Sequence, residues 1–178
     1  GQKTCGVSAV FLLATSIFGA QLDAIFSDIP VAVVKTGMLG TSDIVTTVSR
    51  RLAKQHMQHL VIDPVMVAKG GHPLLDQDAI TTLKSELLPQ ASLLTPNIYE
   101  AEILSGMSIK TLADARAAAK SIYQLGCKHV LIKGGHLSDQ QSAASDQETA
   151  DTTAIPLTAV IRFGNCRTSS SWRSEMAS

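Results

Sequence analysis

The sequence predicts an α/β fold with a mostly parallel central sheet, because short apolar runs alternate with longer amphipathic segments from residue 31 onward. The apolar runs show no alternation with polar residues, which is typical of parallel strands that are covered on both faces. We therefore expect a three-layer arrangement, with helices flanking the sheet. The predicted strands are Val31–Lys35, Leu60–Ile62, Ser92–Leu94 and His129–Ile132.

Helical patterns fill the intervals between these strands, and most have a recognisable beginning or end. The capping stretch Thr41-Ser42-Asp43 precedes one helix, Pro89 follows a second and Gly126 follows a third. The predicted helices are Asp43–Met57, Asp76–Leu88 and Ala113–Leu125, with a shorter one at Ile98–Leu104.

The composition predicts one folded domain over residues 1–178. A hydrophobic content of 45% is enough for a sizeable core, and it excludes a chain that is disordered throughout. The 15 Lys and Arg residues balance the 15 Asp and Glu residues, so the basic face that nucleic acid or anionic lipid requires is not expected. Any phosphate-bearing ligand must therefore be held by local groups.

Cysteine usage and hydropathy predict a cytoplasmic protein. The three cysteines, Cys5, Cys127 and Cys166, form no C-x-x-C pair, and an odd number cannot close into a disulfide framework. A reducing compartment is therefore expected. The longest apolar run, residues 9–14, is far shorter than the roughly 18 residues that a membrane-spanning helix needs.

Residues capable of chemistry cluster where each predicted strand ends. Because the carboxyl ends of parallel strands share one edge of a sheet, these segments should meet there, where open α/β folds bind ligands. The segments are Thr36–Gly40, Asp63–Met66, Thr95–Asn97 with Glu100, and Lys133–His136.

This set of residues suits phosphoryl transfer, which requires positioning and charge neutralisation. Asp63 and Glu100 could supply carboxylates for a divalent metal, Lys133 a cation for phosphates, and Gly134 and Gly135 close backbone approach. The sequence contains neither a G-x-x-x-x-G-K-[ST] loop nor a G-x-G-x-x-G fingerprint, so P-loop and dinucleotide-binding folds lose their main support.

Each of these residues also has a purely structural interpretation. Asp63 before Pro64 suits a turn, and Glu100 in the first turn of a helix complements the helix dipole whatever its function. Lys133 could extend its stem into water, and the two glycines after it could form an ordinary turn.

The sequence contains four motifs at the predicted strand ends: Lys35–Leu39, Val61–Gly71, Leu94–Ala101 and Leu131–His136. In this order and spacing they resemble hydroxymethylpyrimidine/phosphomethylpyrimidine kinases, enzymes of thiamine biosynthesis in the ribokinase-like superfamily. The resemblance implies a ribokinase-like fold and ATP- and Mg²⁺-dependent phosphorylation of hydroxymethylpyrimidine and then of its monophosphate. It spans about residues 19–137.

The resemblance also implies roles for single residues. Asp63 and Glu100 would lie at the metal, with Asn97 organising the metal and its waters near the phosphates. Lys133, Gly134 and Gly135 would contact the nucleotide. The segments that would line the pocket of the pyrimidine substrate contain Gly37, Met38 and Val65.

The chain departs from the family pattern at both ends, and the segment 138–178 is atypical. The Gly-rich opening is missing, and so is the Gly-Thr-Gly-Cys motif that forms the anion hole and supplies the general base. Cys166 is a candidate to replace that motif, but its neighbours lack the glycines that would let backbone amides approach a phosphate. The catalytic base thus stays unknown, and we hypothesise a truncated or alternatively spliced kinase with impaired activity.

Two alternatives remain open at this stage. A pyridoxal kinase would share the metal and phosphate residues and differ in the substrate pocket. The chain could instead be a catalytically inactive fragment that binds nucleotide or dimerises, since losing strands from a parallel sheet exposes apolar surface and promotes association.

Overall fold

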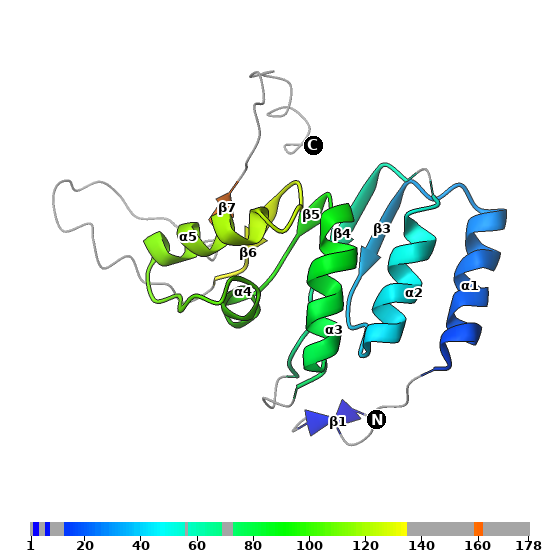
Figure 1. The fold of residues 1–178 in the computed structure, drawn as a ribbon, viewed down its shortest axis with the longest axis horizontal. Coiled ribbons are helices and arrows are strands. Elements are labelled where there is room, and N and C mark those ends of the chain that lie inside the picture. The colour runs from blue at the N-terminus through cyan, green and yellow to red at the C-terminus, as the bar shows by residue number, and fades with distance from the viewer. Residues whose placement is uncertain are drawn as a thin grey trace, which may run out of the picture.

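The computed structural model describes residues 2–3, 6–7, 13–55, 57–68, 73–134 and 159–161. A five-stranded sheet with the order β3-β4-β5-β6-β7 organises most of them (Figure 1). Neighbouring strands from β3 to β6 are parallel, as predicted, whereas β7 runs antiparallel to β6. The bounds are β3 (Val33–Thr36), β4 (His59–Ile62), β5 (Leu93–Leu94), β6 (Val130–Ile132) and β7 (Ala159–Ile161). A separate antiparallel pair joins β1 (Gln2–Lys3) to β2 (Gly6–Val7).

The predicted helices are present, with shifted ends. Where the prediction placed a helix ending at Met57, α2 ends at Leu52, because the chain turns there to enter β4. Pro89 does not end its helix at Leu88. The chain continues through a π-helical turn and then a 3-10 turn whose first positions include Pro89, where a missing N–H is tolerated. The bounds are α2 (Ser42–Leu52), α3 (Gln77–Thr82), η1 (Leu83–Leu87), η2 (Leu88–Gln90), α4 (Ile98–Ser105) and α5 (Leu112–Tyr123).

The sequence analysis missed α1 (Thr15–Asp28), the two-residue strands β1 and β2, and β7. Helix α1 carries apolar residues on more than one side, its N-cap Ala14 makes no side-chain cap, and neither end bears a charge that complements the dipole. Strand β7 is three residues long and antiparallel, so the alternation of strands and helices gave no signal for it.

The order of the strands explains where the helices lie. Each connection from β3 to β4, β5 and β6 moves to the next strand in the same direction, and right-handed crossovers then place every connecting helix on one face. Figure 1 shows α2 and α3 across the front of β3 and β4. Helix α1 lies beside α2, since Arg51 of α2 donates to the carbonyl of Gly19 at 3.1 Å and to the carboxylate of Asp23 at 3.0 Å.

Burial in the strands follows from this one-sided arrangement. Five strand residues that face the helices are at most 2% exposed and belong to one core cluster with them; they are Leu60, Ile62, Leu94, Val130 and Ile132. Val61, Leu93 and Leu131 on the opposite face are only half-buried, and Val33 is 54% exposed. We expected helices on both faces of the sheet. The described helices cover one of them.

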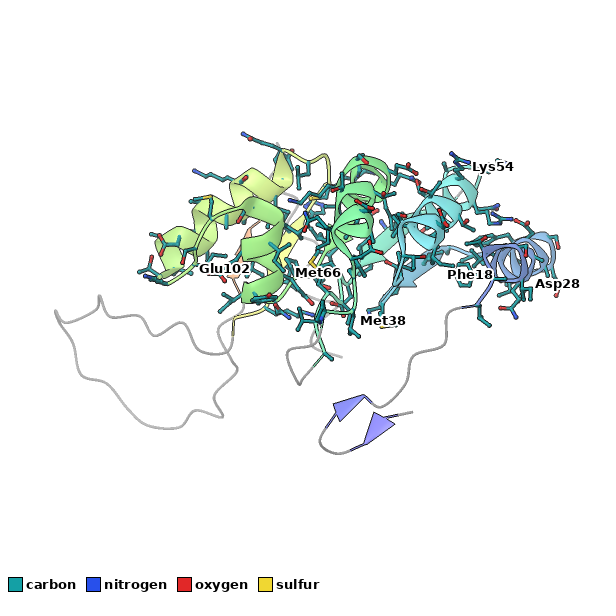
Figure 2. The ribbon with its side chains drawn as sticks, turned by 60° about the horizontal axis from the view of Figure 1, so that its bottom comes forward. Phe18, Asp28, Met38, Lys54, Met66 and Glu102 are labelled. Atoms are coloured by element: carbon teal, nitrogen blue, oxygen red, sulfur yellow. The ribbon has the colours of Figure 1, made fainter. Side chains whose placement is uncertain are left out.

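Exposed apolar side chains concentrate on α1 and the edge strand β3. Among the described residues, large apolar side chains at least 47% exposed here are Leu13, Ile17, Ile25, Ile29 and Val33. Figure 2 shows α1 at one end of the molecule, where Phe18 and Asp28 mark its two ends. The described part of the chain leaves this corner open to solvent.

None of the helices in the described ranges combines the length and apolarity that a bilayer-spanning helix needs. Cys127 is 1% exposed, and burial raises the pKa of its thiol to about 11, as expected of a cysteine that packs as a small apolar residue.

Two glycines with positive φ allow a test of local packing. Gly106 has φ +72° with open space where a Cβ would lie, whereas Gly126 has φ +104° and a Cβ there would lie 3.1 Å from the Cα of Pro89. We expect Gly106→Ala to cost about 1 kcal/mol of unfolding free energy from the backbone conformation alone. Gly126→Ala should cost about 1–3 kcal/mol more, because it also crowds η2. Urea unfolding measures both values, and equal losses would contradict the packing argument.

Candidate functional site

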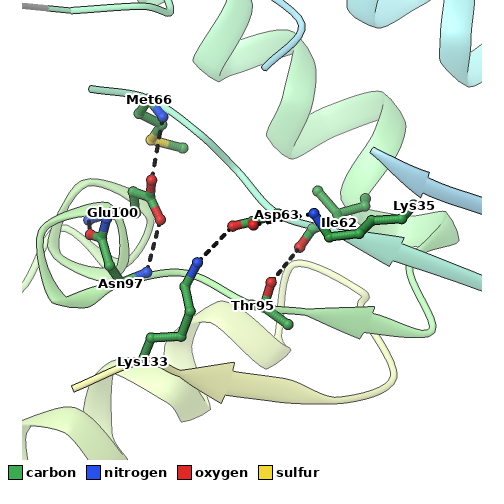
Figure 3. Close-up of polar contacts among 8 residues, drawn as sticks. All are labelled: Lys35, Ile62, Asp63, Met66, Thr95, Asn97, Glu100 and Lys133. Carbon is green, nitrogen blue, oxygen red and sulfur yellow. Dashed lines mark hydrogen bonds and ion pairs between the residues drawn. The ribbon is translucent and has the colours of Figure 1, made fainter. Parts of the chain in front are cut away.

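Asp63 lies between two lysines at the carboxyl edge of the sheet (Figure 3). It directly follows β4, and its two carboxylate oxygens accept from two different lysines, one in β3 and one just after β6. Lys133 Nζ donates to Oδ1 at 2.8 Å, and Lys35 Nζ donates to Oδ2 at 3.4 Å. The structure thus joins two predicted site residues, Asp63 and Lys133, and adds Lys35 as a third.

Strand register brings these side chains together. Lys35 pairs with Val61 across β3 and β4, and Asp63 lies two residues beyond Val61. Because successive side chains alternate between the faces of a sheet, Lys35 and Val61 both point away from the helices. Lys133 follows β6 with the same alternation, one residue after the buried Ile132. The charged cluster therefore lies at the edge of the face that the described helices leave open.

The two lysines determine the ionisation of Asp63. Partial burial by itself would raise the pKa of this carboxyl, but the hydrogen bonds and charges of Lys133 and Lys35 outweigh it and hold the pKa below its usual range. The carboxylate is consequently anionic over the whole neutral range, which is the form that a cation binds.

Asn97 and Glu100 form a capping box at the start of α4. The side chain of Asn97 accepts from the N–H of Glu100 at 2.8 Å, and Glu100 Oε2 accepts from the N–H of Asn97 at 2.8 Å. The other oxygen, Oε1, accepts from the N–H of Met66 at 3.4 Å. These contacts give Glu100 a structural role, because this carboxylate caps α4 and also ties it to the segment after β4.

Glu100 is 3% exposed, and its environment differs from that of Asp63. Burial raises the pKa of Glu100 above its usual value, although hydrogen bonds from the backbone of Asn97 and Met66 and the charge of Lys133 act in the opposite direction. A cation beside this buried carboxylate would relieve part of the cost of its charge.

Backbone pairing continues past the strand ends and brings Asn97 next to Lys133. The N–H of Lys133 donates to the carbonyl of Pro96 at 2.7 Å, and Asn97 and Lys133 form an isolated parallel bridge. Gly134 is buried directly after Lys133. Gly135 and Cys166 lie outside the described residues.

The residues predicted to line a pyrimidine pocket follow β3 and β4. The N–H of Asp63 donates to the carbonyl of Thr36 at 3.0 Å, which holds the two segments side by side. Met38 is 42% exposed, and Gly37 and Val65 are half-buried. A Cβ on Gly37 would meet nothing within 4 Å, so this position has free space beside it.

The acidic residues at this edge fit a magnesium site completed by a nucleotide. Within the described ranges, no three His, Cys, Asp or Glu side chains converge as a metal-binding group. Mg²⁺ commonly takes one or two carboxylates and fills its other positions with water and substrate phosphates. Asp63 and Glu100 match that donor set, so they would hold the ion only together with other ligands.

A comparison with protein families decides the affiliation of the chain. The family model for phosphomethylpyrimidine kinase matches residues 1–165. The chain belongs to this family. The matched phosphomethylpyrimidine kinase region extends beyond residues 19–137, the range over which the sequence resembles the family.

Individual phosphomethylpyrimidine kinases give the same result. The hydroxymethylpyrimidine/phosphomethylpyrimidine kinase of Salmonella typhimurium is 45% identical over 142 residues, which are 79% of this chain and 53% of the relative. The chain thus spans about half the length of that protein. The crystal structure of phosphomethylpyrimidine kinase from Clostridium difficile 630 matches with a TM-score of 0.71 and 38% identity, covering 90% of this chain and 67% of the other.

A vitamin kinase of different specificity is also similar. Pyridoxal kinase from Staphylococcus aureus in complex with AMP-PCP and pyridoxal matches with a TM-score of 0.66 and 34% identity, over 75% of this chain and 47% of the other. These structures confirm the ribokinase-like fold class that the motifs of this phosphomethylpyrimidine kinase family member imply.

Sequence reasoning missed two contributions to the site. Lys35 belonged to a recognised motif but was given no role. It pairs with Val61, and Asp63 lies two residues further on, so the side chains of Lys35 and Asp63 are on the same face of the sheet; only this register could have indicated the contact. The N–H of Met66 donates to Glu100, a backbone contact for which a sequence carries no signal.

The two carboxyls should affect the pH dependence of stability in opposite directions. Because the folded pKa of Asp63 is lowered, its stabilisation is present above the unfolded pKa and is lost as the pH falls through the folded value. Because the folded pKa of Glu100 is raised, its contribution is present below the unfolded pKa and is lost as the pH rises through the folded value.

We therefore expect the unfolding free energy of the chain, relative to Asp63→Asn, to decrease toward acid pH. Relative to Glu100→Gln, the unfolding free energy of the chain should decrease toward neutral pH. Weakening the helix cap in this variant changes the size of the difference by the same amount at every pH and does not change its slope. Denaturant unfolding between about pH 3 and 7 measures both differences. Slopes of the same sign would show that at least one of the two environments is wrongly described.

Proposed function

We propose that this chain binds ATP with Mg²⁺ at the carboxyl edge of the sheet and phosphorylates hydroxymethylpyrimidine and its monophosphate. The observation that carries the proposal is the convergence of Asp63, Lys133 and the Asn97–Glu100 pair at one edge, in a member of the phosphomethylpyrimidine kinase family. This edge is where parallel α/β sheets bind ligands.

Lys133 is suited to bind a phosphate. Its side chain is 45% exposed, so its ammonium group can exchange Asp63 for another anion without being drawn out of a core. Gly134 follows it and allows close approach of backbone to a ligand. When bound, Mg²⁺ would neutralise phosphate charge, and Asp63 and Glu100 are the residues that would hold it.

The substrate end of the site would lie beside β3 and β4. Gly37, Met38 and Val65 are near the Thr36–Asp63 hydrogen bond, and none is deeply buried, so they can contact a flat aromatic ring. In this arrangement the segments after β3 and β4 bind the pyrimidine, and those after β5 and β6 bind the nucleotide. The acceptor hydroxyl would then meet the γ-phosphate near Asp63.

We expect slow turnover from this chain. Its sequence contains no Gly-Thr-Gly-Cys motif. Losing an oxyanion-type donor set costs about 100- to 1,000-fold in rate, and a missing general base costs more. With ATP, Mg²⁺ and hydroxymethylpyrimidine we therefore predict turnover below about 0.1 per second, against about 1–100 per second for typical kinases. Turnover in the typical range would show that another group supplies the base.

Nucleotide binding is testable without turnover. A ligand that binds only the folded state raises the unfolding temperature, so MgATP should stabilise the chain in a thermal-shift titration. Lys133→Met should remove most of that shift, whereas Lys120→Met, an exposed lysine on α5, should leave it unchanged. No shift with the unsubstituted chain would refute the nucleotide site, and an equal shift with Lys133→Met would refute the role of Lys133.

Pyridoxal is the second candidate substrate, because pyridoxal kinases match this fold at 34% identity. Parallel titrations with hydroxymethylpyrimidine and pyridoxal in the presence of MgATP distinguish the two. Nucleotide-dependent stabilisation without turnover of either compound would favour an inactive nucleotide-binding fragment.

We also propose that the exposed apolar corner formed by α1 and β3 promotes self-association. Sedimentation velocity should show mass increasing with concentration, and Ile17→Lys with Ile25→Lys should shift the chain toward monomer. A monomer at all concentrations would contradict the proposal. We place the protein in a reducing compartment such as the cytoplasm, in keeping with the buried free thiol of Cys127.

A further inference from the structure

Two lysines pair with the single carboxylate of Asp63. Lys133 pairs with one oxygen and Lys35 with the other. We propose that Lys35 is a positioning residue that keeps Asp63 in place when Lys133 leaves it to bind a nucleotide phosphate. The inference rests on the proposed function, since it assigns Lys35 a part in nucleotide binding at the same edge.

The two lysines are held differently. Lys35 lies in β3, whose four residues all pair with β4, so strand register fixes the position of its backbone relative to the end of β4. Lys133 lies just beyond β6 and is attached there by its bridge to Asn97. Lys133 is therefore on the side of the cluster that faces the Asn97–Glu100 pair, where the phosphates would bind, and Lys35 is on the other side (Figure 3).

The charges at the site indicate what Lys35 contributes. With both lysines present, the two ammonium groups balance the carboxylates of Asp63 and of Glu100, whose charge also interacts with Lys133 and Asp63. When Lys133 moves to a phosphate, Lys35 is the cation that the described part of the chain leaves on Asp63. Without Lys35, no described side chain would bond to Asp63 after this exchange, and the carboxylate could rotate away from the position in which it would hold Mg²⁺.

The contacts of Lys35 support this specific role. Its ammonium group is bonded to Asp63, and its side chain is 62% exposed, so it adds little to the core. An exposed pair of this kind contributes little to stability. A substitution at Lys35 should consequently affect ligand binding more than folding.

Calorimetric titration of the full 178-residue chain with AMP-PCP and Mg²⁺ tests the inference. We expect Lys35→Met to weaken binding by about 3- to 10-fold, the range for one partly exposed charged hydrogen bond. Lys35→Arg should restore affinity to within about 2-fold, because it keeps the charge. In an Asp63→Asn background, Lys35→Met should cause no further loss, because the group it positions is gone.

The matched control is Lys54→Met, the same change at an exposed lysine between the end of α2 and the start of β4, at the edge of the sheet opposite the site. It should bind like the unsubstituted chain, and circular dichroism should show all variants folded. Unchanged affinity in Lys35→Met, an equal loss in Lys54→Met, or an undiminished loss in the Asp63→Asn background would each overturn the role of Lys35 alone. No binding by the unsubstituted chain would instead overturn the proposed nucleotide site together with this inference.

Discussion

The direction of the strand connections is the constraint from which the rest of the structure follows. From β3 to β6 every connection moves one strand across in the same sense, and right-handed crossovers then leave no choice about where the helices go. One face of the sheet is packed, and the strands end along one edge. The core and the candidate site are two results of this single topological fact.

The two carboxylates at this edge of the sheet make different kinds of contact. Glu100 is a structural residue by every contact it makes, since both oxygens accept backbone hydrogen bonds. Asp63 instead uses both oxygens on side-chain cations that can move. A buried, tied carboxylate beside an exchangeable one suits a site that must keep its shape while its ligands change, and the opposite pKa shifts of the two groups reflect these environments.

The sequence predicted the parallel strands and most helices because apolar runs, capping residues and glycines act locally. Helix α1 escaped prediction because it has no capping side chain and no single apolar side, and β7 because a short antiparallel strand breaks the pattern. At the site, the rule that parallel strands end at one edge of a sheet correctly predicted that Asp63 and Lys133 lie close together. The contact of Lys35 with Asp63 depends on the register between β3 and β4, which no local pattern specifies. The functional roles of all the site residues remain predictions: Asp63 and Glu100 at the metal, Asn97, Lys133, Gly134 and Gly135 at the nucleotide, and Gly37, Met38 and Val65 at the substrate.

The bond from Met66 to Glu100 helps to connect three segments of the site. The carboxylate joins the segment after β4 to the first turn of α4, and the bridge between Asn97 and Lys133 continues the link to β6. Folding of α4 therefore already orders much of the proposed ligand-binding edge. A nucleotide arriving there would lose less affinity to the ordering of loops than at an edge built from independent segments.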